Sequence, residues 1–151
     1  MKRRLAREIA VQSLYQMEMN EVMASEAVEM IAEEAGRENN DLGADSAGLG
    51  PVVRHALELT EGVSGHLAAI DDMLQQYLTG WQVDRLSRVD RQILRLAAYE
   101  LVYRDDVPPK AAVNEAIELA KHFGTDESGK FVNGVLGKVI GALEELKARE
   151  S

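Results

Sequence analysis

The sequence predicts an all-helical protein. Apolar residues recur at three- and four-residue spacing along most of the chain, which is the period of an amphipathic helix. Strict alternation of apolar and polar residues is rare, and the 151 residues include only three prolines and six Phe or Tyr residues. A chain of this length is expected to form one domain, here residues 1–151, with a core large enough to be stable without cross-links.

The first half of the chain predicts two helices and a loop. The first helix is expected over about residues 3–19, with a buried stripe of Ala6, Ile9, Ala10, Ser13, Leu14 and Met17. A second is expected to begin near Ser25, a good N-cap residue, and to turn Ala27, Met30 and Ile31 inward. Residues 36–50 contain four glycines, two asparagines and two aspartates. This composition predicts a loop.

The second half predicts four or five further helices. One is expected to start at Pro51 and to end at Gly80, with a kink or break near Gly62 and Gly65. The others are expected over about 84–103, 110–123 and 127–148, where the prolines at 108 and 109 end one helix and Gly124 caps the next. Six or seven helices are therefore expected in all, depending on whether the break occurs.

Composition excludes several classes of protein. The chain has no cysteine, so it forms no disulfide and no thiolate metal site. It has no apolar run of about 18 residues, so no membrane span is expected. The basic N-terminus is not followed by an apolar signal core. A cytoplasmic protein fits these features.

The charge is distributed unevenly. Residues 1–7 contain four basic residues and no acid, whereas residues 8–46 contain ten acids and Arg37 as the only base. The net charge of the whole chain is −9. A basic tip on an acidic body is compatible with nucleic-acid binding only through a local surface.

No pattern in the sequence indicates catalysis. His55, His66 and His122 are scattered without the spacing of metal ligands, and neither a zinc-protease, a phosphate-loop nor a serine-hydrolase motif is present. The abundant acids are typical of a solvated surface. We therefore expect no enzyme activity, no cofactor and no metal site.

The first helix carries the strongest functional signal. At 100° per residue, Arg4, Arg7, Val11 and Tyr15 fall in one narrow wedge, with Arg3 beside it. Arginine neutralises phosphate and stacks on bases, and an exposed tyrosine offers a face to an unstacked base. This pattern is typical of single-stranded RNA binding. The alternative, which the residues leave open, is a basic end that aids solubility while Tyr15 packs at the core edge.

Two other features favour structural explanations. Arg88, Arg91 and Arg95 project from the helix over about 84–103, opposite its apolar stripe, and are expected to form a solvated face paired with acids. Trp81 follows Gly80 at a helix junction and is expected to be a packing anchor.

Three stretches of the chain, taken together, resemble the NusB family. The first is Arg4–Glu8 leading to Gln12–Tyr15. The second is Trp81, Arg85–Leu86 and Val89–Leu101. The third is Val107–Pro108, Asn114–Lys121, Phe123–Gly124 and Phe131–Leu136. Their order and spacing cover nearly the whole chain except residues 20–50.

The resemblance implies a bundle of about six or seven helices in two packed subdomains. It also implies transcription antitermination on ribosomal RNA operons, without catalysis or a cofactor. Members of this bacterial family bind the boxA element of the nascent RNA together with NusE, a small-subunit ribosomal protein, and so join other Nus factors on RNA polymerase.

The resemblance also implies the site residues. RNA would contact Arg3, Arg4, Arg7, Tyr15, Phe123, Gly124, Glu127, Ser128, Lys130 and Phe131. Gly124 would let the backbone approach a phosphate, Glu127 would restrain binding by repulsion, and Phe131 either touches RNA or only packs. The protein partner would contact Asp90 and its neighbour Arg91, where an acidic body meets a basic ribosomal protein.

Leu5 interrupts the arginine run, unlike the longer run of some members. Four phosphate contacts on a single strand give a salt slope of only about −3, so weak, partner-dependent RNA binding is expected. Two alternatives stay open: a helical adaptor that binds protein but not RNA, and a targeting domain like those that precede some ribosomal RNA methyltransferases. A homodimer that masks the RNA surface is also compatible with the sequence.

Overall fold

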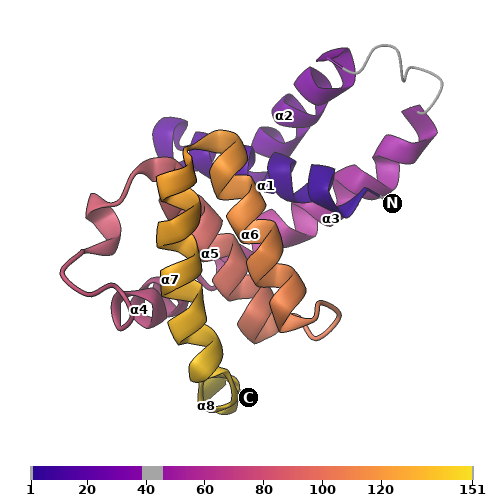
Figure 1. Ribbon diagram of the computed structural model, residues 1–151. Helices are drawn as coiled ribbons and strands as arrows, with labels where there is room; N and C mark the ends of the chain where they lie inside the picture. The colour runs from indigo at the N-terminus through magenta and orange to yellow at the C-terminus, as the bar shows by residue number, and fades with distance from the viewer. Residues whose placement is uncertain (1, 39–45, 151) are drawn as a thin grey trace. The chain divides into compact units, whose positions relative to one another are not determined.

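The computed structural model describes residues 2–38 and 46–150, and within these residues every regular element is helical. Eight α-helices and one 3-10 turn follow one another along this part of the chain (Figure 1). The chain divides into two compact units, Met1–Ser64 and Gly65–Ser151. The predicted all-α class is confirmed.

The first unit contains α1 (Arg3–Asn20), α2 (Ala24–Glu38) and α3 (Ser46–Gly65). Its core joins one apolar stripe from each helix: Ala6, Ile9, Val28, Ile31, Val52 and Ala56. Helix α1 ends at Glu21, whose left-handed backbone (φ 51°) turns the chain while its N–H still donates to the Met17 carbonyl at 3.0 Å. The predicted first helix is confirmed.

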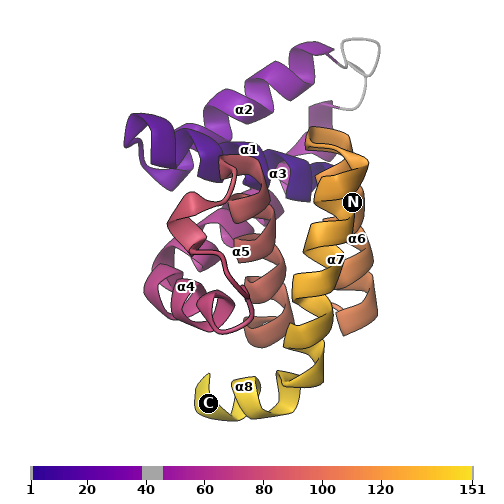
Figure 2. The same cartoon turned by 60° about the vertical axis from the view of Figure 1, so that its left-hand side comes forward.

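The second unit is built around α5 (Arg88–Tyr103). Buried side chains occur on nearly every side of this helix, from Arg91 through Val102, which is typical of a central helix. Around it lie α4 (Leu67–Gln75), α6 (Pro109–Phe123), α7 (Asp126–Gly141) and α8 (Leu143–Glu150), while the 3-10 turn η2 (Val83–Arg85) precedes α5. Helices α6 and α7 lie side by side in both views and form a helical hairpin (Figures 1 and 2).

A short polar segment links α5 to α6. Arg104 donates to both carboxylate oxygens of Asp106, at 3.0 Å each. This hydrogen bond with Asp106 is the main reason that the pKa of the Arg104 guanidinium is raised above its usual range. Pro108 and Pro109 follow, and α6 begins at Pro109. The predicted start of this helix is confirmed within one residue.

The predicted loop over residues 36–50 is wrong at both ends. Helix α2 continues to Glu38 and α3 already begins at Ser46, while residues 39–45 lie outside the described part. Pro51 therefore lies inside α3 and not at its start. Because proline has no backbone N–H, the helical hydrogen bond from position 51 to residue 47 is missing there.

The helix count of six or seven is also too low, since the described residues contain eight. The expected break near Gly65 is present, because α3 ends at Gly65 and α4 begins at Leu67. The unexpected break follows Gly141, where Ala142 (φ −113°, ψ 13°) leaves the helical conformation and separates α7 from α8. Helix α4 ends at Gln75, well before Gly80, whose φ of +79° places it in a turn.

Helix α5 begins at Arg88, four residues later than expected. The side chain of Ser87 accepts a hydrogen bond from the Asp90 N–H and caps the helix there, since serine is among the preferred N-cap residues. The residues near Asp84 instead form η2.

Three residues predicted to pack inward are exposed to different degrees. Met17 is half-buried, Met30 is 42 % exposed and Trp81 is 56 % exposed. The packing role expected of Trp81 is therefore wrong. Spacing along one helix gives the direction of a side chain but not whether a neighbouring helix covers it.

Truncating the buried Leu94 should destabilise the protein strongly. Leu94 is 0 % exposed, and Leu94→Ala should lower the free energy of unfolding by about 2–5 kcal/mol through lost burial and a cavity. Leu67, which is 37 % exposed, is the matched control, and Leu67→Ala should cost less than about 1 kcal/mol. Urea denaturation followed by circular dichroism measures both. Equal losses would contradict the placement of Leu94 in the core.

Candidate nucleic-acid and protein-binding surfaces

The N-terminus of α1 presents two exposed arginines, Arg3 and Arg4. They occupy the first turn, which contains no acid and has no side-chain cap. Cations at this end oppose the helix macrodipole, which is unfavourable by roughly 0.3–1 kcal/mol per charge. The helix dipole therefore does not account for the position of these arginines, and their role in binding RNA stays a prediction.

The rest of the predicted wedge is less accessible. Arg7 is only 5 % exposed and Val11 is 2 % exposed, while Tyr15 is half-buried. The wedge is therefore exposed at its N-terminal end and covered further along. The RNA-binding roles of Arg7 and Tyr15 stay predictions.

The connection between α6 and α7 has a tightly determined backbone. Gly124 follows the last residue of α6, and the Thr125 side chain caps α7 by accepting from the Ser128 N–H at 3.2 Å. A Cβ atom on Gly124 would lie 2.7 Å from Ser128 Oγ and 2.9 Å from the Ala120 carbonyl oxygen. Only glycine fits there without a shift of the chain. The predicted cap at Gly124 is confirmed.

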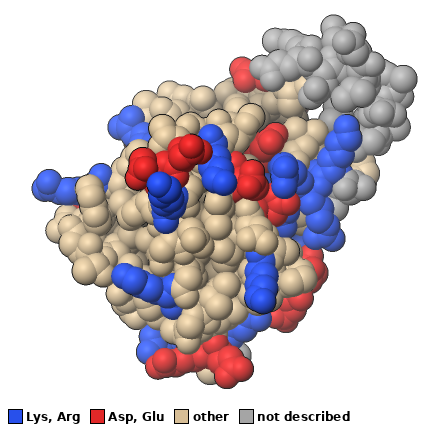
Figure 3. Space-filling model, viewed as in Figure 1, with Lys and Arg blue, Asp and Glu red and all other residues tan. Residues whose placement is uncertain are grey.

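The side chains of this loop are mixed in exposure and charge. Gly124, Glu127 and Lys130 are exposed, whereas Phe123, Ser128 and Phe131 are half-buried. Lys130 Nζ lies 3.5 Å from Glu127 Oε1, an exposed ion pair. Basic and acidic side chains are interspersed over α6 and α7 in Figure 3. The loop therefore offers phosphate little net positive field.

A hydrogen bond joins this loop to the start of α5. Ser128 Oγ donates to Asp90 Oδ2 at 3.5 Å, a long contact at the limit for a hydrogen bond. Asp90 is half-buried in the first turn of α5. One residue predicted to bind RNA thus contacts one predicted to bind the protein partner, within the second unit.

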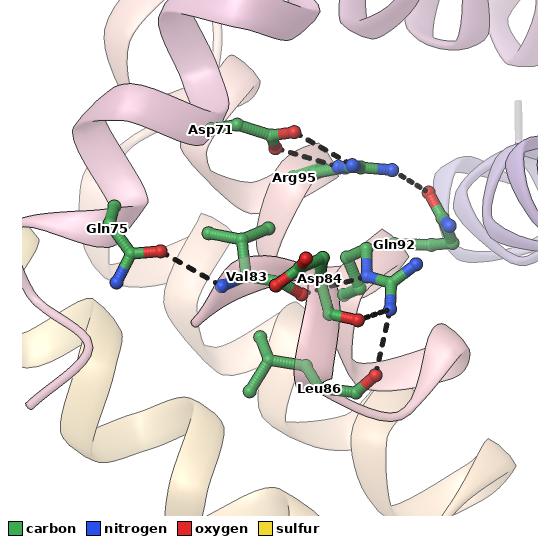
Figure 4. Close-up of polar contacts among 8 residues, drawn as sticks. Asp71, Gln75, Val83, Asp84, Leu86, Gln92 and Arg95 are labelled. Atoms are coloured by element: carbon green, nitrogen blue, oxygen red, sulfur yellow. Dashed lines mark hydrogen bonds and ion pairs between the residues drawn. The ribbon is translucent and has the colours of Figure 1, made fainter. Parts of the chain in front are cut away.

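Arg91 lies beside Asp90 but is turned inward and is 9 % exposed. Its Nε donates to the Val83 carbonyl at 2.9 Å, and its Nη2 donates to the carbonyls of Asp84 at 2.9 Å and Leu86 at 3.0 Å (Figure 4). A direct contact between Arg91 and a partner stays a prediction.

Arg95 is also largely buried. It forms a bidentate ion pair with Asp71, in which Nε donates to Oδ1 and Nη2 donates to Oδ2, each at 2.8 Å (Figure 4). The Arg95 side chain is 11 % exposed. The expected pairing with an acid is present. The expected solvated face is wrong for Arg91 and Arg95, because α5 is covered on that side too.

The candidate residues fall into two groups. Arg3, Arg4, Arg7 and Tyr15 belong to the first unit, and the loop residues with Asp90 and Arg91 belong to the second. Among residues 2–38 and 46–150, no cluster of three or more His, Asp or Glu side chains is placed to hold a metal ion. No helix in those ranges is both long and apolar enough to cross a membrane.

Sequence reasoning missed Gln75, Ser87 and Thr125, which shape the candidate surfaces. Ser87 and Thr125 each precede a helix as a hydroxyl residue with acids in the following turn, so N-cap preferences could have identified them. Gln75 carries no comparable signal, because its two backbone partners lie six and eight residues further along the chain.

Comparison with known proteins defines the class of this helical chain. The NusB family profile matches residues 4–141. The transcription antitermination protein NusB of Myxococcus xanthus is 45 % identical over 143 residues, which cover 95 % of this chain and 97 % of that protein. The chain belongs to the NusB family.

Two solved structures agree with this assignment. The T. maritima NusB structure matches with a TM-score of 0.76 at 35 % sequence identity. The match covers 92 % of this chain and 90 % of the T. maritima chain. A chain of the crystal structure of antitermination factors NusB and NusE in complex with dsRNA has a TM-score of 0.77 at 28 % identity. It covers 94 % of this chain and 99 % of its own.

The close approach at Gly124 predicts a specific sensitivity. Gly124→Ala should force Ser128 or the end of α6 to move and lower the free energy of unfolding by about 1–3 kcal/mol. Gly134 is the matched control, because it lies inside α7 and a Cβ added there would meet no atom within 4 Å. Gly134→Ala should instead stabilise by about 0.4–1 kcal/mol. Thermal and urea unfolding distinguish the two, and a stable Gly124→Ala variant would contradict the loop geometry.

Proposed function

We propose that this chain is a transcription antitermination factor that binds the boxA RNA of ribosomal RNA operons together with NusE. In this role it joins the antitermination complex and reaches other Nus factors and RNA polymerase indirectly. Membership of the NusB family supports the proposal, as do the antitermination protein from M. xanthus and the structural match to a NusB and NusE complex with dsRNA. This function belongs in the bacterial cytoplasm.

The contact between Ser128 and Asp90 is the observation that carries the proposal. It links the loop proposed for RNA to the acid proposed for the ribosomal protein. A partner that contacts Asp90 would also fix the side chain that receives the Ser128 hydroxyl, so binding of one ligand would favour binding of the other. The proposal therefore includes RNA binding that depends on the protein partner.

The residues proposed to contact RNA form one group in each unit. Arg3, Arg4 and Arg7 neutralise phosphates and Tyr15 stacks on a base, while the α6–α7 loop contributes Phe123, Gly124, Ser128, Lys130 and Phe131. Glu127 limits affinity by repulsion. Since the chain carries a net charge of −9, its own attraction for RNA is weak, and a basic partner supplies the missing positive field.

The partner surface begins at Asp90, with the acidic body offering complementarity to a basic ribosomal protein. No catalytic step and no cofactor form part of this proposal. A helical adaptor that binds protein but not RNA is the second candidate, and the burial of Arg7 favours it. One titration separates the two.

We expect labelled boxA RNA to bind this protein weakly, and at least about tenfold more tightly when NusE is present, a coupling in the usual range of 1–3 kcal/mol. Fluorescence anisotropy at fixed salt measures this, with a scrambled RNA as the control. Absence of any boxA preference at low salt with NusE bound would leave the adaptor as the better description.

Removal of the two exposed arginines should weaken RNA binding without loss of folding. In a plot of the logarithm of the binding constant against the logarithm of the salt concentration, the double variant Arg3→Ala, Arg4→Ala should give a slope that is smaller in magnitude by about 1.4. This corresponds to roughly 0.7 for each lost contact with a single strand. Arg149→Ala is the matched control, because Arg149 is exposed on α8 and pairs with Glu145 at 3.0 Å. A change per removed charge that is equal in the two variants would indicate only general electrostatics.

A further inference from the structure

The segment Trp81–Leu86 between α4 and α5 contains both exposed and buried side chains. Val83 and Leu86 are buried, whereas Trp81, Gln82, Asp84 and Arg85 are exposed. Trp81 is the only tryptophan of the chain and is 56 % exposed. A large aromatic side chain left in water is unfavourable unless something covers it, and tryptophan is the residue type most typical of binding hot spots.

Two long side chains hold the backbone of this segment. Gln75 Nε2 donates to the Trp81 carbonyl at 2.7 Å, and Gln75 Oε1 accepts from the Val83 N–H at 3.0 Å. Arg91 donates to the carbonyls of Val83, Asp84 and Leu86, three residues that Figure 4 labels. The carbonyl or N–H groups of four of the six residues are therefore bonded to a side chain from α4 or α5.

The guanidinium group is suited to this task. Its donors point in fixed directions within one plane, so one side chain reaches three carbonyls at once. A lysine ammonium in the same place keeps the charge but is a flexible point donor. The turn that Arg91 holds leads directly into Ser87, the cap of α5, and then to Asp90.

We infer that Arg91 and Gln75 are positioning residues for protein binding, which hold Trp81 and Asp84 in the conformation that contacts the basic partner beside Asp90. The inference rests on the proposed function. The partner would place cationic side chains against the two carboxylates and over the indole face, where a guanidinium is attracted by the ring. In this inference Arg91 affects partner binding by holding the turn in place and does not itself contact the partner.

Affinity for purified NusE tests the inference. Arg91→Lys and Gln75→Ala should each weaken binding by up to about tenfold, because the turn conformation that places Trp81 becomes a minor population and the protein then binds mainly without the Trp81 contact. Trp81→Ala should weaken binding about tenfold or more. Arg95→Lys is the control, since Arg95 lies one turn further along the same helix and its guanidinium pairs with Asp71. It should lower the melting temperature but leave the Kd within about twofold of the unaltered protein.

A double-mutant cycle separates positioning from general destabilisation. If Arg91 acts by placing Trp81, then Trp81→Ala should cost less than about threefold in the Arg91→Lys background. If Arg91 only stabilises the fold, Trp81→Ala should keep its full cost there. Fluorescence anisotropy of the single tryptophan gives an independent readout, and Arg91→Lys should make Trp81 more mobile while Arg95→Lys should not.

The outcomes distinguish this inference from the proposed function. If the unaltered protein does not bind NusE, the proposed function fails and this inference fails with it. If the unaltered protein binds but Arg91→Lys binds equally well, or the cycle shows no coupling to Trp81, the inference alone is overturned. Selective loss of affinity, coupled to Trp81 and absent in Arg95→Lys, supports it.

Discussion

The burial of α5 on almost all sides is the constraint on which the second unit depends. Ile93, Leu94, Leu96 and Leu101 are each no more than 2 % exposed, and α4, α6, α7 and α8 all contact this helix. A helix enclosed in this way cannot rotate without disrupting several neighbours, because protein interiors are close-packed. The first turn of α5, which carries Asp90, is therefore fixed in direction by the core.

Burial of α5 also decides the fate of its polar residues. Arg91 and Arg95 cannot reach bulk water freely, and an unpaired buried charge is costly. Arg95 pairs with the carboxylate of Asp71, and Arg91 donates hydrogen bonds to three backbone carbonyls. The hydrogen bonds of Arg91 connect the core to the Trp81–Leu86 segment. A binding surface on that segment would be held in place by side chains that are anchored in the core.

Much of the fold could be predicted from the sequence, because the apolar stripes of α1, α5, α6 and α7 are long and regular. The start of α3 at Ser46 and the break at Ala142 could not, since glycine-rich composition and an unbroken stripe suggested otherwise. Periodicity gave the direction of Arg7 and Met30 but not their exposure, which depends on packed neighbours. Gly124 could be predicted as a helix cap, whereas the support by Gln75 links residues that no sequence pattern connects.

A chain with a net negative charge can bind RNA if its basic residues are clustered at one surface and if a partner protein contributes to the affinity. Arg3 and Arg4 stand at the positive end of α1, where they weaken the helix. The α6–α7 loop places Lys130 against Glu127, so its charge is partly cancelled. Neither surface is strongly attractive by itself. A basic protein bound at Asp90 would supply charge next to Ser128, and RNA recognition would then belong to the pair of proteins and not to this chain alone.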